Sequence, residues 1–413
     1  MGTRWNGTRS GTGSRQAVKK KQSWLAAEAL FAAASLRIRR GSAVEKSNGS
    51  PVVKLRGVYK RFDKVVAVEK TDLDIDEGSL VTLLGPSGCG KTTILRMIAG
   101  LETPTEGDIY IQGKRVNDIP IHKRNLGMIF QNYALFPHKT IFDNVAFGLK
   151  YRNVPKKEIK EKVTRALEMV RLPGVENRMP SQLSGGQQQR IALARAIVIE
   201  PVVLLMDEPL SALDENLRED MRREIDNLQQ MLGVTTVFVT HDQREALSMS
   251  DKIVVMKDGL MQQEGPPEAV YNYPVNHFVA DFLGHSNFLD GVVIGREGEN
   301  FRVKVGDSNE ILVHHPGDWS DGDRVEIVVR AHNYEVSPRG KNEQKSDMNC
   351  FNGTIIDRSY MGGEVSYFVE LENKTVLHAI GIAKLRPFRR GQEVWIQVQP
   401  QHCGLLPKGN DQA

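Results

Sequence analysis

At 413 residues the chain exceeds what one hydrophobic core usually organises, so its length predicts two domains. A hydrophobic fraction of 40% and a charged fraction of 26% are ordinary for a globular protein, and a formal net charge of +4 gives no argument for nucleic-acid binding. The widely separated Cys89, Cys350 and Cys403 form no disulfide pattern, which fits a reducing cytoplasm. No segment reaches the roughly 20 apolar residues that span a bilayer, so a role at a membrane would require a partner.

Residues 1–50 differ from the rest of the chain. They are rich in Lys, Arg, Gly and Ser, contain only Glu28 and Glu45 as acids, and have one helix-like segment, Trp24–Leu36. This composition predicts a basic, disordered extension or a misassigned start. A membrane-surface helix and an arginine-rich targeting peptide remain alternatives.

From about Val52 the pattern is that of an α/β domain. Wholly apolar runs such as Leu80–Leu84 and Val202–Met206 alternate with amphipathic helical segments such as Ile159–Val170 and Arg218–Met231. Such runs predict a buried, mostly parallel sheet covered by helices. We assign residues 51–286 to this domain.

Residues 287–413 have the pattern of an all-β domain of barrel or sandwich type. Short alternating segments are separated by Gly, Pro and Asp, and the polar stretch Ser337–Asn349 is expected to be a loop. The clearest strands expected here are Phe301–Val305, Arg324–Val329, Val365–Glu370 and Glu393–Val398.

The segment Gly85-Pro86-Ser87-Gly88-Cys89-Gly90-Lys91-Thr92 matches the phosphate-binding pattern G-x-x-x-x-G-K-[ST]. It follows the apolar run Leu80–Leu84 and precedes a helical segment, Thr92–Ala99, as that pattern requires. Backbone N–H groups and the helix N-terminus can then surround phosphate oxygens. Lys91 would neutralise the β- and γ-phosphates, and the Thr92 hydroxyl would bind Mg²⁺.

Two acids end the apolar run that begins at Val202. Asp207 is expected to hold Mg²⁺, directly or through water. Glu208 is placed to polarise an attacking water molecule, a general-base role that suits a carboxylate at the end of a strand. Many strands end in acids, so the pair indicates a nucleotide site only because the chain also contains the phosphate-binding pattern.

The stretch Leu183-Ser184-Gly185-Gly186-Gln187, followed by Gln188-Gln189-Arg190, resembles the LSGGQ signature of ABC ATPases. Ser184 can cap the following helix, and the two glycines leave backbone N–H groups accessible to a γ-phosphate. Further matches follow in the family's order: Gln131 resembles the Q-loop glutamine, Ser211–Asp214 the D-loop, and His241 the switch histidine. The resemblance therefore implies an α/β P-loop NTPase domain with a helical subdomain.

An aromatic residue near the start of such a domain is expected to stack on adenine, and spacing favours Phe62 over Tyr59. The resemblance implies ATP and Mg²⁺ as cofactors, Glu208, His241 and Gln131 as catalytic residues, and Thr92, Gln131 and Asp207 as metal-binding residues. The residues assigned to nucleotide binding are Phe62, Gly85, Pro86, Ser87, Gly88, Cys89, Gly90, Lys91, Thr92, Thr93, Ser184, Gly185, Gly186, Gln187 and Asp214.

In this family two copies sandwich two ATP molecules head to tail, so a homodimer is implied. The chain lacks the fused membrane helices common in exporters, and its C-terminal part resembles the OB-like TOBE module of importer ATPases. The linking segment that begins with Gln263–Glu268 resembles that of sugar, polyamine and iron importers. The stretch Ser286–Leu289 most resembles the spermidine/putrescine importers, followed by the ferric-iron importers; sugar importers remain an alternative. The module's usual Arg-Pro-Glu element is replaced here by Arg330-Ala331-His332-Asn333, so no regulatory role is inferred from it.

An importer ATPase works at the cytoplasmic face of the plasma membrane with two permease subunits, and indirectly with an extracytoplasmic solute-binding protein. The stretch Tyr133–His138 follows the Q-loop, where the family receives a permease helix. Exposed aromatics such as Tyr133 or Phe136 would suit that groove, and core packing is the equal alternative. A rival function is an ABC ATPase acting on nucleic acid or ribosomes; we expect no nucleic acid. A regulatory protein without turnover ranks last, because Glu208, Gln131 and His241 are intact.

Overall fold

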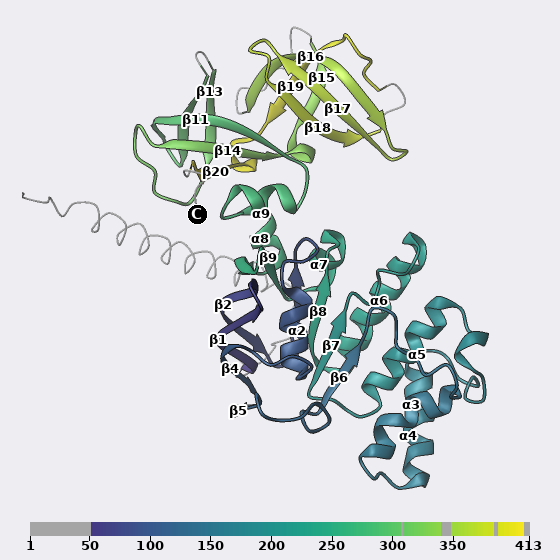
Figure 1. Ribbon diagram of the computed structural model, residues 1–413. Helices are drawn as coiled ribbons and strands as arrows, with labels where there is room; N and C mark the ends of the chain where they lie inside the picture. Colours follow the sequence, from purple (N-terminus) through teal and green to yellow (C-terminus); the bar gives the residue numbers. More distant parts are fainter. Residues whose placement is uncertain (1–50, 307–308, 340–347, 384–386, 409–413) are drawn as a thin grey trace, which may run out of the picture. The chain divides into compact units, whose positions relative to one another are not determined.

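The computed structural model describes residues 51–306, 309–339, 348–383 and 387–408 (Figure 1). The basic extension expected over residues 1–50, with its helix-like segment Trp24–Leu36, lies outside the described residues. The chain divides into two compact units, the first ending at Asn272 and the second continuing from Tyr273. The division therefore falls before the expected start of the β domain at residue 287.

A six-stranded sheet forms the centre of the first unit. Its order is β10-β9-β3-β8-β7-β6, in which β10 alone runs antiparallel to its neighbour. Every residue of β3, β7 and β8 is buried, which explains why β3 and β7 are mostly apolar and why β8 combines apolar residues only with threonine. The parallel sheet expected from the sequence is confirmed. The strands are β3 (Leu80–Leu84), β6 (Leu126–Ile129), β7 (Val203–Asp207), β8 (Thr235–Thr240), β9 (Lys252–Lys257) and β10 (Leu260–Gly265).

A second, antiparallel sheet lies in the same unit, in the order β2-β1-β4-β5. One hydrophobic core joins both sheets to the helix α2, which begins directly after the phosphate-loop motif. The loop is therefore anchored on a rigid frame. The elements are β1 (Pro51–Phe62), β2 (Val65–Asp76), α2 (Lys91–Ala99), β4 (Glu106–Ile111) and β5 (Lys114–Arg115).

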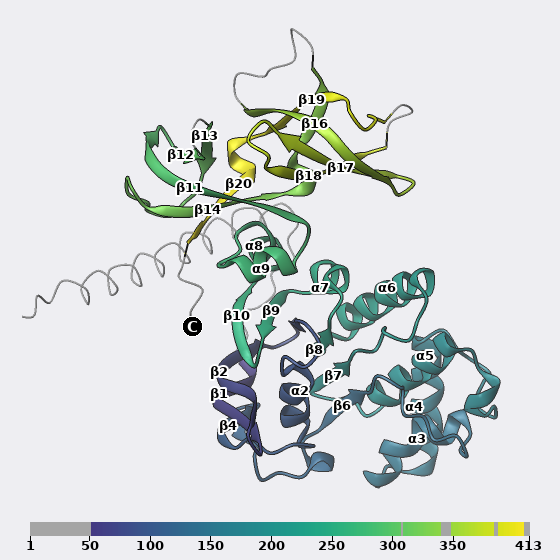
Figure 2. The same ribbon diagram turned by 45° about the horizontal axis from the view of Figure 1, so that its top comes forward.

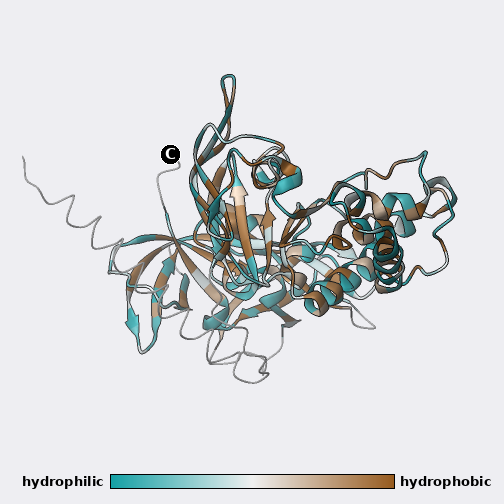
Figure 3. Cartoon of the chain, turned by 90° about the horizontal axis from the view of Figure 1, so that it is seen from below, coloured by the Kyte–Doolittle hydropathy of each residue, from teal (hydrophilic) through white to brown (hydrophobic). Residues whose placement is uncertain are grey.

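Helices α3 (Ile141–Tyr151), α4 (Lys156–Met169) and α5 (Gly185–Ile197) form the helical subdomain and lie side by side in Figure 2. They share a separate hydrophobic core with α6 and parts of the central sheet. In Figure 3 the helices carry hydrophobic residues on one side and hydrophilic residues on the other, as expected for helices that cover a core. Besides these three helices and α2, the unit contains α6 (Glu215–Leu232), α7 (Gln243–Met249) and α8 (Pro267–Asn272), with short 3₁₀ turns at Ile121–Lys123 and Pro180–Gln182.

The second unit opens with the short helix α9 (His277–Phe282) and continues as two five-stranded antiparallel sheets. Residues from both sheets form one core, which confirms the all-β prediction. The first sheet has the order β13-β12-β11-β14-β20, with strands Asn309–His314, Asn300–Val305, Ser286–Glu297, Arg324–Arg330 and Cys403–Pro407. The second has the order β15-β19-β16-β17-β18, with strands Glu335–Pro338, Glu393–Val398, Asn349–Tyr360, Glu364–Leu371 and Val376–Ile382.

The expected loop over Ser337–Asn349 is too long at both ends. Strand β15 includes Ser337 and Pro338, whose neighbours across the ladder are Trp395 and Val394 of β19, and Asn349 begins β16. Residues 340–347 lie outside the described part of the chain. The polar composition of this segment predicted a loop, but the backbone of β15 pairs with β19 at the edge of the sheet, and an edge strand can carry polar side chains.

The amide side chain of Asn287 joins the two sheets of the second unit. Its Oδ1 accepts a hydrogen bond of 2.7 Å from the backbone N–H of His378, and its Nδ2 donates to the carbonyl oxygens of His378 at 2.8 Å and Val329 at 3.4 Å. Asn287 is 6% exposed. Because a buried amide is costly unless it is hydrogen-bonded, this contact favours one position of β11 of the first sheet against β18 of the second.

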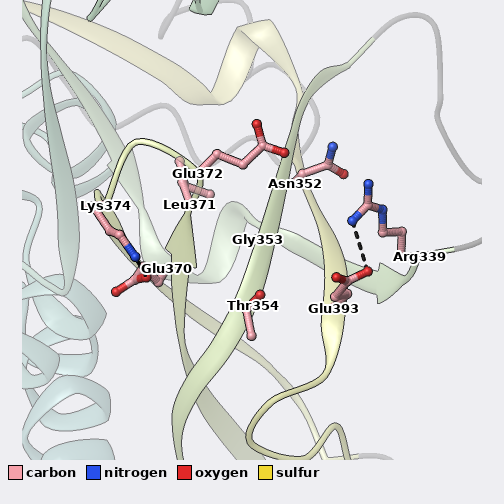
Figure 4. A pocket seen from close by; sticks show the side chains of 9 residues that line it. All are labelled: Arg339, Asn352, Gly353, Thr354, Glu370, Leu371, Glu372, Lys374 and Glu393. Carbon is pink, nitrogen blue, oxygen red and sulfur yellow. Dashed lines mark hydrogen bonds and ion pairs between the residues drawn. The ribbon is translucent and has the colours of Figure 1, made fainter.

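The outer face of the second sheet carries a polar pocket of about 240 Å³ (Figure 4). Two ion pairs border it, Arg339 with Glu393 at 2.9 Å and Lys374 with Glu370 at 2.8 Å. Both pairs are exposed, so each contributes only about 0–1 kcal/mol to stability.

Candidate active site

The phosphate loop connects the end of β3 to α2 through a turn that requires glycine. Gly90 has φ 101°, and a Cβ there would lie 2.4 Å from the carbonyl oxygen of Ala67. A Cβ on Gly85 would lie 2.3 Å from the carbonyl oxygen of Met256. Among the described residues no side chain caps the N-terminus of α2, so its N–H groups are available for an anion.

Lys91 is held inside this loop. It is 4% exposed, and its Nζ donates hydrogen bonds of 2.7 Å to the carbonyl oxygen of Gly85 and 2.8 Å to that of Pro86. Cys89 lies beside it, with its Sγ 3.7 Å from Nζ, and burial raises the pKa of the Cys89 thiol. The carbonyl oxygens of the loop therefore bind the buried ammonium group of Lys91, whose positive charge favours an anion beside it.

Thr92 and Asp207 meet at the end of β7. The Thr92 Oγ1 donates a hydrogen bond of 2.8 Å to Asp207 Oδ1. Burial raises the pKa of the Asp207 carboxyl, and the hydrogen bond from Thr92 opposes that change. A hydroxyl and a carboxylate are the hard oxygen ligands that Mg²⁺ prefers. The pair therefore fits an ion that takes its other ligands from phosphate and water. The described residues contain no group of three or more His, Cys, Asp or Glu side chains that could hold a metal.

Glu208 lies between two side chains that come from other strands. Gln131 Nε2 donates a hydrogen bond of 3.3 Å to Glu208 Oε2, and His241 Nδ1 lies 3.3 Å from Glu208 Oε1. Gln131 follows β6, Glu208 follows β7 and His241 follows β8, three adjacent parallel strands. A carboxylate held from both sides at the edge of a sheet is arranged to accept a proton from water.

The signature segment begins α5. Ser184 is the N-cap, its Oγ accepting from the N–H of Gln187 at 3.4 Å, while Gln187 Oε1 accepts from the N–H of Ser184 at 3.1 Å. The capping predicted for Ser184 is confirmed, in the reciprocal form in which both residues cap each other. Gly185 and Gly186 occupy the first turn, so their backbone N–H groups point out of the helix end.

Asp214 caps α6, with its Oδ1 accepting from the N–H of Leu217 at 3.0 Å. The next helix turn carries Arg218, which sequence reasoning did not single out. Its Nη2 donates to the carbonyl oxygen of Leu213 at 3.0 Å, and its Nη1 lies 3.5 Å from Asp242 Oδ2. Arg218 therefore ties the expected D-loop to the segment that follows His241.

The two aromatic candidates for adenine stacking differ in exposure. Phe62 ends β1 and is 42% exposed, with Lys60 Nζ 4.5 Å from the centre of its ring. Tyr59 is half-buried, and its carbonyl oxygen accepts from the N–H of Thr105 at 2.8 Å. The geometry gives Phe62 the more accessible ring, and its role stays a prediction.

Of the two alternatives for Tyr133, the structure supports core packing rather than exposure. Tyr133 is 7% exposed and packs in the core of the helical subdomain, while Phe136 is half-buried. The aromatic character of this stretch reflects packing. The residue that holds this segment, Arg195, was also missed; the signal was a basic residue surrounded by buried apolar positions on α5.

These features together define the nucleotide-binding domain of an ABC-type ATPase. They are the phosphate loop, the Thr92–Asp207 pair, the position of Glu208 between Gln131 and His241, and the signature segment that caps α5. Family models match the chain as an ABC transporter over residues 68–211 and as a TOBE domain over residues 327–406. The spermidine/putrescine import ATP-binding protein PotA of Rubrobacter xylanophilus is 44% identical over 87% of this chain and 95% of the relative. The protein of the same name from Vibrio cholerae is 46% identical over 80% of this chain and 86% of the relative.

Among solved structures, cbiO1 from Clostridium perfringens, part of the ABC transporter complex cbiONQ, matches with 28% identity and a TM-score of 0.51. That match covers 54% of this chain and 90% of the other. The chain belongs to the family of ABC transporter ATP-binding proteins with a C-terminal TOBE domain, and it is an ATPase. No helix within the described ranges is long and apolar enough to cross a membrane.

Proposed function

We propose that this chain is the ATP-hydrolysing subunit of an importer that takes up a polyamine of the spermidine or putrescine type. The observation that carries the enzymatic part is the position of Glu208 between Gln131 and His241. The solute is supported by the names of relatives that match nearly their whole length. Ferric iron and sugars remain the alternative solutes, since an importer ATPase does not itself contact the cargo.

Different residues bind the nucleotide, hold the metal ion and act on the attacking water. Lys91 and the N–H groups of the loop bind the β- and γ-phosphates, and Phe62 stacks on adenine. Thr92 and Asp207 hold Mg²⁺, which neutralises phosphate charge when bound. Glu208 is the catalytic base, and Gln131 and His241 keep its carboxylate and the attacking water aligned.

The working form is a homodimer with two permease subunits at the cytoplasmic face of the plasma membrane. Ser184 to Gln187 and Asp214 hydrogen-bond within their own helix ends, which leaves the N–H groups of Gly185 and Gly186 for the ATP bound by the other copy. ATP then favours the closed dimer and hydrolysis releases it. A solute-binding protein outside the membrane delivers the cargo, and no nucleic acid takes part.

The test is uptake of radiolabelled spermidine by native-host cells that carry the gene deleted, the wild-type gene, or the Glu208→Gln variant. We expect uptake only with the wild-type gene, and competition by unlabelled putrescine but not by maltose or ferric citrate. Uptake that is unchanged by deletion would reject the polyamine assignment.

The transport class is tested separately by purifying the tagged chain from detergent-solubilised membranes. Two multi-span permease subunits in the purified complex would support an importer. Ribosomal proteins or nucleic acid, bound in a manner that weakens steeply with salt, would overturn it in favour of the rival function.

A further inference from the structure

Arg195 lies in the last turn of α5, at the opposite end from the signature residue Ser184. Its guanidinium donates two hydrogen bonds of 2.7 Å, from Nη1 to the carbonyl oxygen of Ala134 and from Nη2 to that of Tyr133. The ring of Phe136 lies 5.8 Å away, and no carboxylate of the described residues is within ion-pair distance. The positive charge of Arg195 is therefore directed at the backbone of one loop, and its burial lowers the pKa of the guanidinium.

The turn that Arg195 holds is strained. Tyr133 has φ 59° and Ala134 has φ 46°, two consecutive left-handed residues of which neither is glycine. Such a conformation persists only where surrounding contacts impose it. The forked guanidinium can bind two neighbouring carbonyl oxygens at once, which a lysine ammonium cannot do in the same geometry.

Only Asn132 separates this turn from Gln131, and the chain beyond the turn is also held by a side chain. Asn144 of α3 is completely buried; its Oδ1 accepts from the N–H of Phe136 at 2.8 Å, and its Nδ2 donates to the carbonyl oxygens of Phe136, Lys139 and Thr140. With Asn144 holding the later part of the loop, Arg195 decides the position of the part that carries Gln131.

We propose that Arg195 is a positioning residue for ATP hydrolysis: it holds the Tyr133–Ala134 turn so that Gln131 reaches Glu208. The inference rests on the proposed roles of Gln131 and Glu208. Arg195 itself contacts neither nucleotide nor water.

The test is a double-mutant cycle on the full-length chain with Arg195→Met, Gln131→Ala and the combined variant, measured as kcat and as ATP affinity. We expect Arg195→Met to lower kcat about tenfold and to change ATP affinity less than about twofold, because the phosphate loop is untouched. In the Gln131→Ala background the same substitution should have no further effect on kcat. Additive losses of kcat would overturn the inference, as would an unchanged kcat in Arg195→Met.

Two controls separate positioning from folding. Arg152→Met removes an arginine of the same subdomain that also donates to a backbone carbonyl oxygen, that of Ile199 at 3.0 Å, and its kcat should stay near that of the wild type. Arg195→Lys keeps the charge but loses the fork, so its kcat should fall between wild type and Arg195→Met; if Arg195→Met does not fold, the cycle is run with Arg195→Lys. Full activity of Glu208→Gln would reject the proposed function itself, whereas its inactivity beside additive Arg195 and Gln131 effects would reject the Arg195 inference alone.

Discussion

The hydroxyl of Thr92, at the start of α2, donates a 2.8 Å hydrogen bond to the buried carboxylate of Asp207, at the end of β7. The two residues are brought together by adjacent elements of the central sheet and its helix. Thr92→Val would remove the donor and leave the Asp207 carboxylate without it, while Thr92→Ser would keep it. We expect Thr92→Val to lose Mg²⁺-dependent ATPase activity by at least about tenfold and Thr92→Ser to lose less than that, which Mg²⁺ titrations of ATPase activity will measure. Equal behaviour of the two variants would contradict a metal-binding role for the hydroxyl.

Glu208→Gln should retain ATP binding and lose hydrolysis by about a thousandfold, because an amide cannot accept a proton from water. With ATP present the variant should accumulate as a dimer, measured by light scattering after size-exclusion chromatography. Glu219→Gln on the exposed face of α6 is the matched control, since it loses a carboxylate away from the site. A Glu208→Gln protein that stays monomeric with ATP would count against the sandwich dimer.

Phe62→Ala should weaken ATP binding about tenfold, since stacking of a base on an aromatic ring contributes roughly 1–3 kcal/mol. Tyr59→Leu tests the alternative and should leave the affinity close to wild type. Both dissociation constants can be measured by isothermal titration calorimetry. The opposite ranking of the two variants would transfer the adenine contact to Tyr59.

The second unit should become less stable when the pH is lowered below 6.5, because its folded state requires an uncharged His315. Burial lowers the pKa of His315 to about 4, and its Nδ1 accepts hydrogen bonds from the N–H of Gly317 at 3.0 Å and from Trp319 Nε1 at 3.2 Å, so the folded state requires the neutral ring. The unfolded chain takes up a proton near pH 6.5, whereas the folded chain does so only near pH 4. This contribution to stability is therefore complete above pH 6.5 and is lost as the pH falls toward 4, by about 2 kcal/mol at pH 5.

Urea unfolding followed by tryptophan fluorescence at pH 7.5 and pH 5 measures this effect. His315→Asn should reduce the difference between the two pH values, and the substitution of an exposed histidine of the same unit, His402→Asn, should preserve it. If both variants keep the wild-type pH dependence, another group is responsible.

Asn287→Ala should destabilise the second unit by about 2–3 kcal/mol, because it leaves the N–H and carbonyl groups of His378 without the partner that joins the two sheets. Asn287→Asp keeps the acceptor but places a buried negative charge opposite the carbonyl oxygens of His378 and Val329, so it should destabilise the unit at least as much as Asn287→Ala. The exposed Asn373→Ala serves as the control and should cost less than about 1 kcal/mol. Unfolding free energies that do not separate Asn287→Ala from Asn373→Ala would show that the contact does not stabilise the fold.

The sequence by itself determined the features that depend on neighbouring residues. The loop from Gly85 to Thr92 and the cap at Ser184 could be predicted because their backbone geometry is set by residues within a few positions. The apolar strands β3 and β7 could be predicted within a residue or so, since complete burial leaves a continuous apolar run. Family resemblance then supplied candidate roles for Gln131 and His241.

Only the tertiary structure decided which distant residues touch. The contact between Gln131 and Glu208 spans 77 positions and exists because β6 and β7 are neighbours in the sheet, an order that local spacing does not specify. The same reason explains why the sequence could not choose between exposure and packing for Tyr133, whose burial depends on the helical subdomain. It also explains the omission of Arg195, whose partners lie 61 and 62 positions away. Local sequence sets the shape of each segment, whereas packing of the sheet and helices determines which segments form one site.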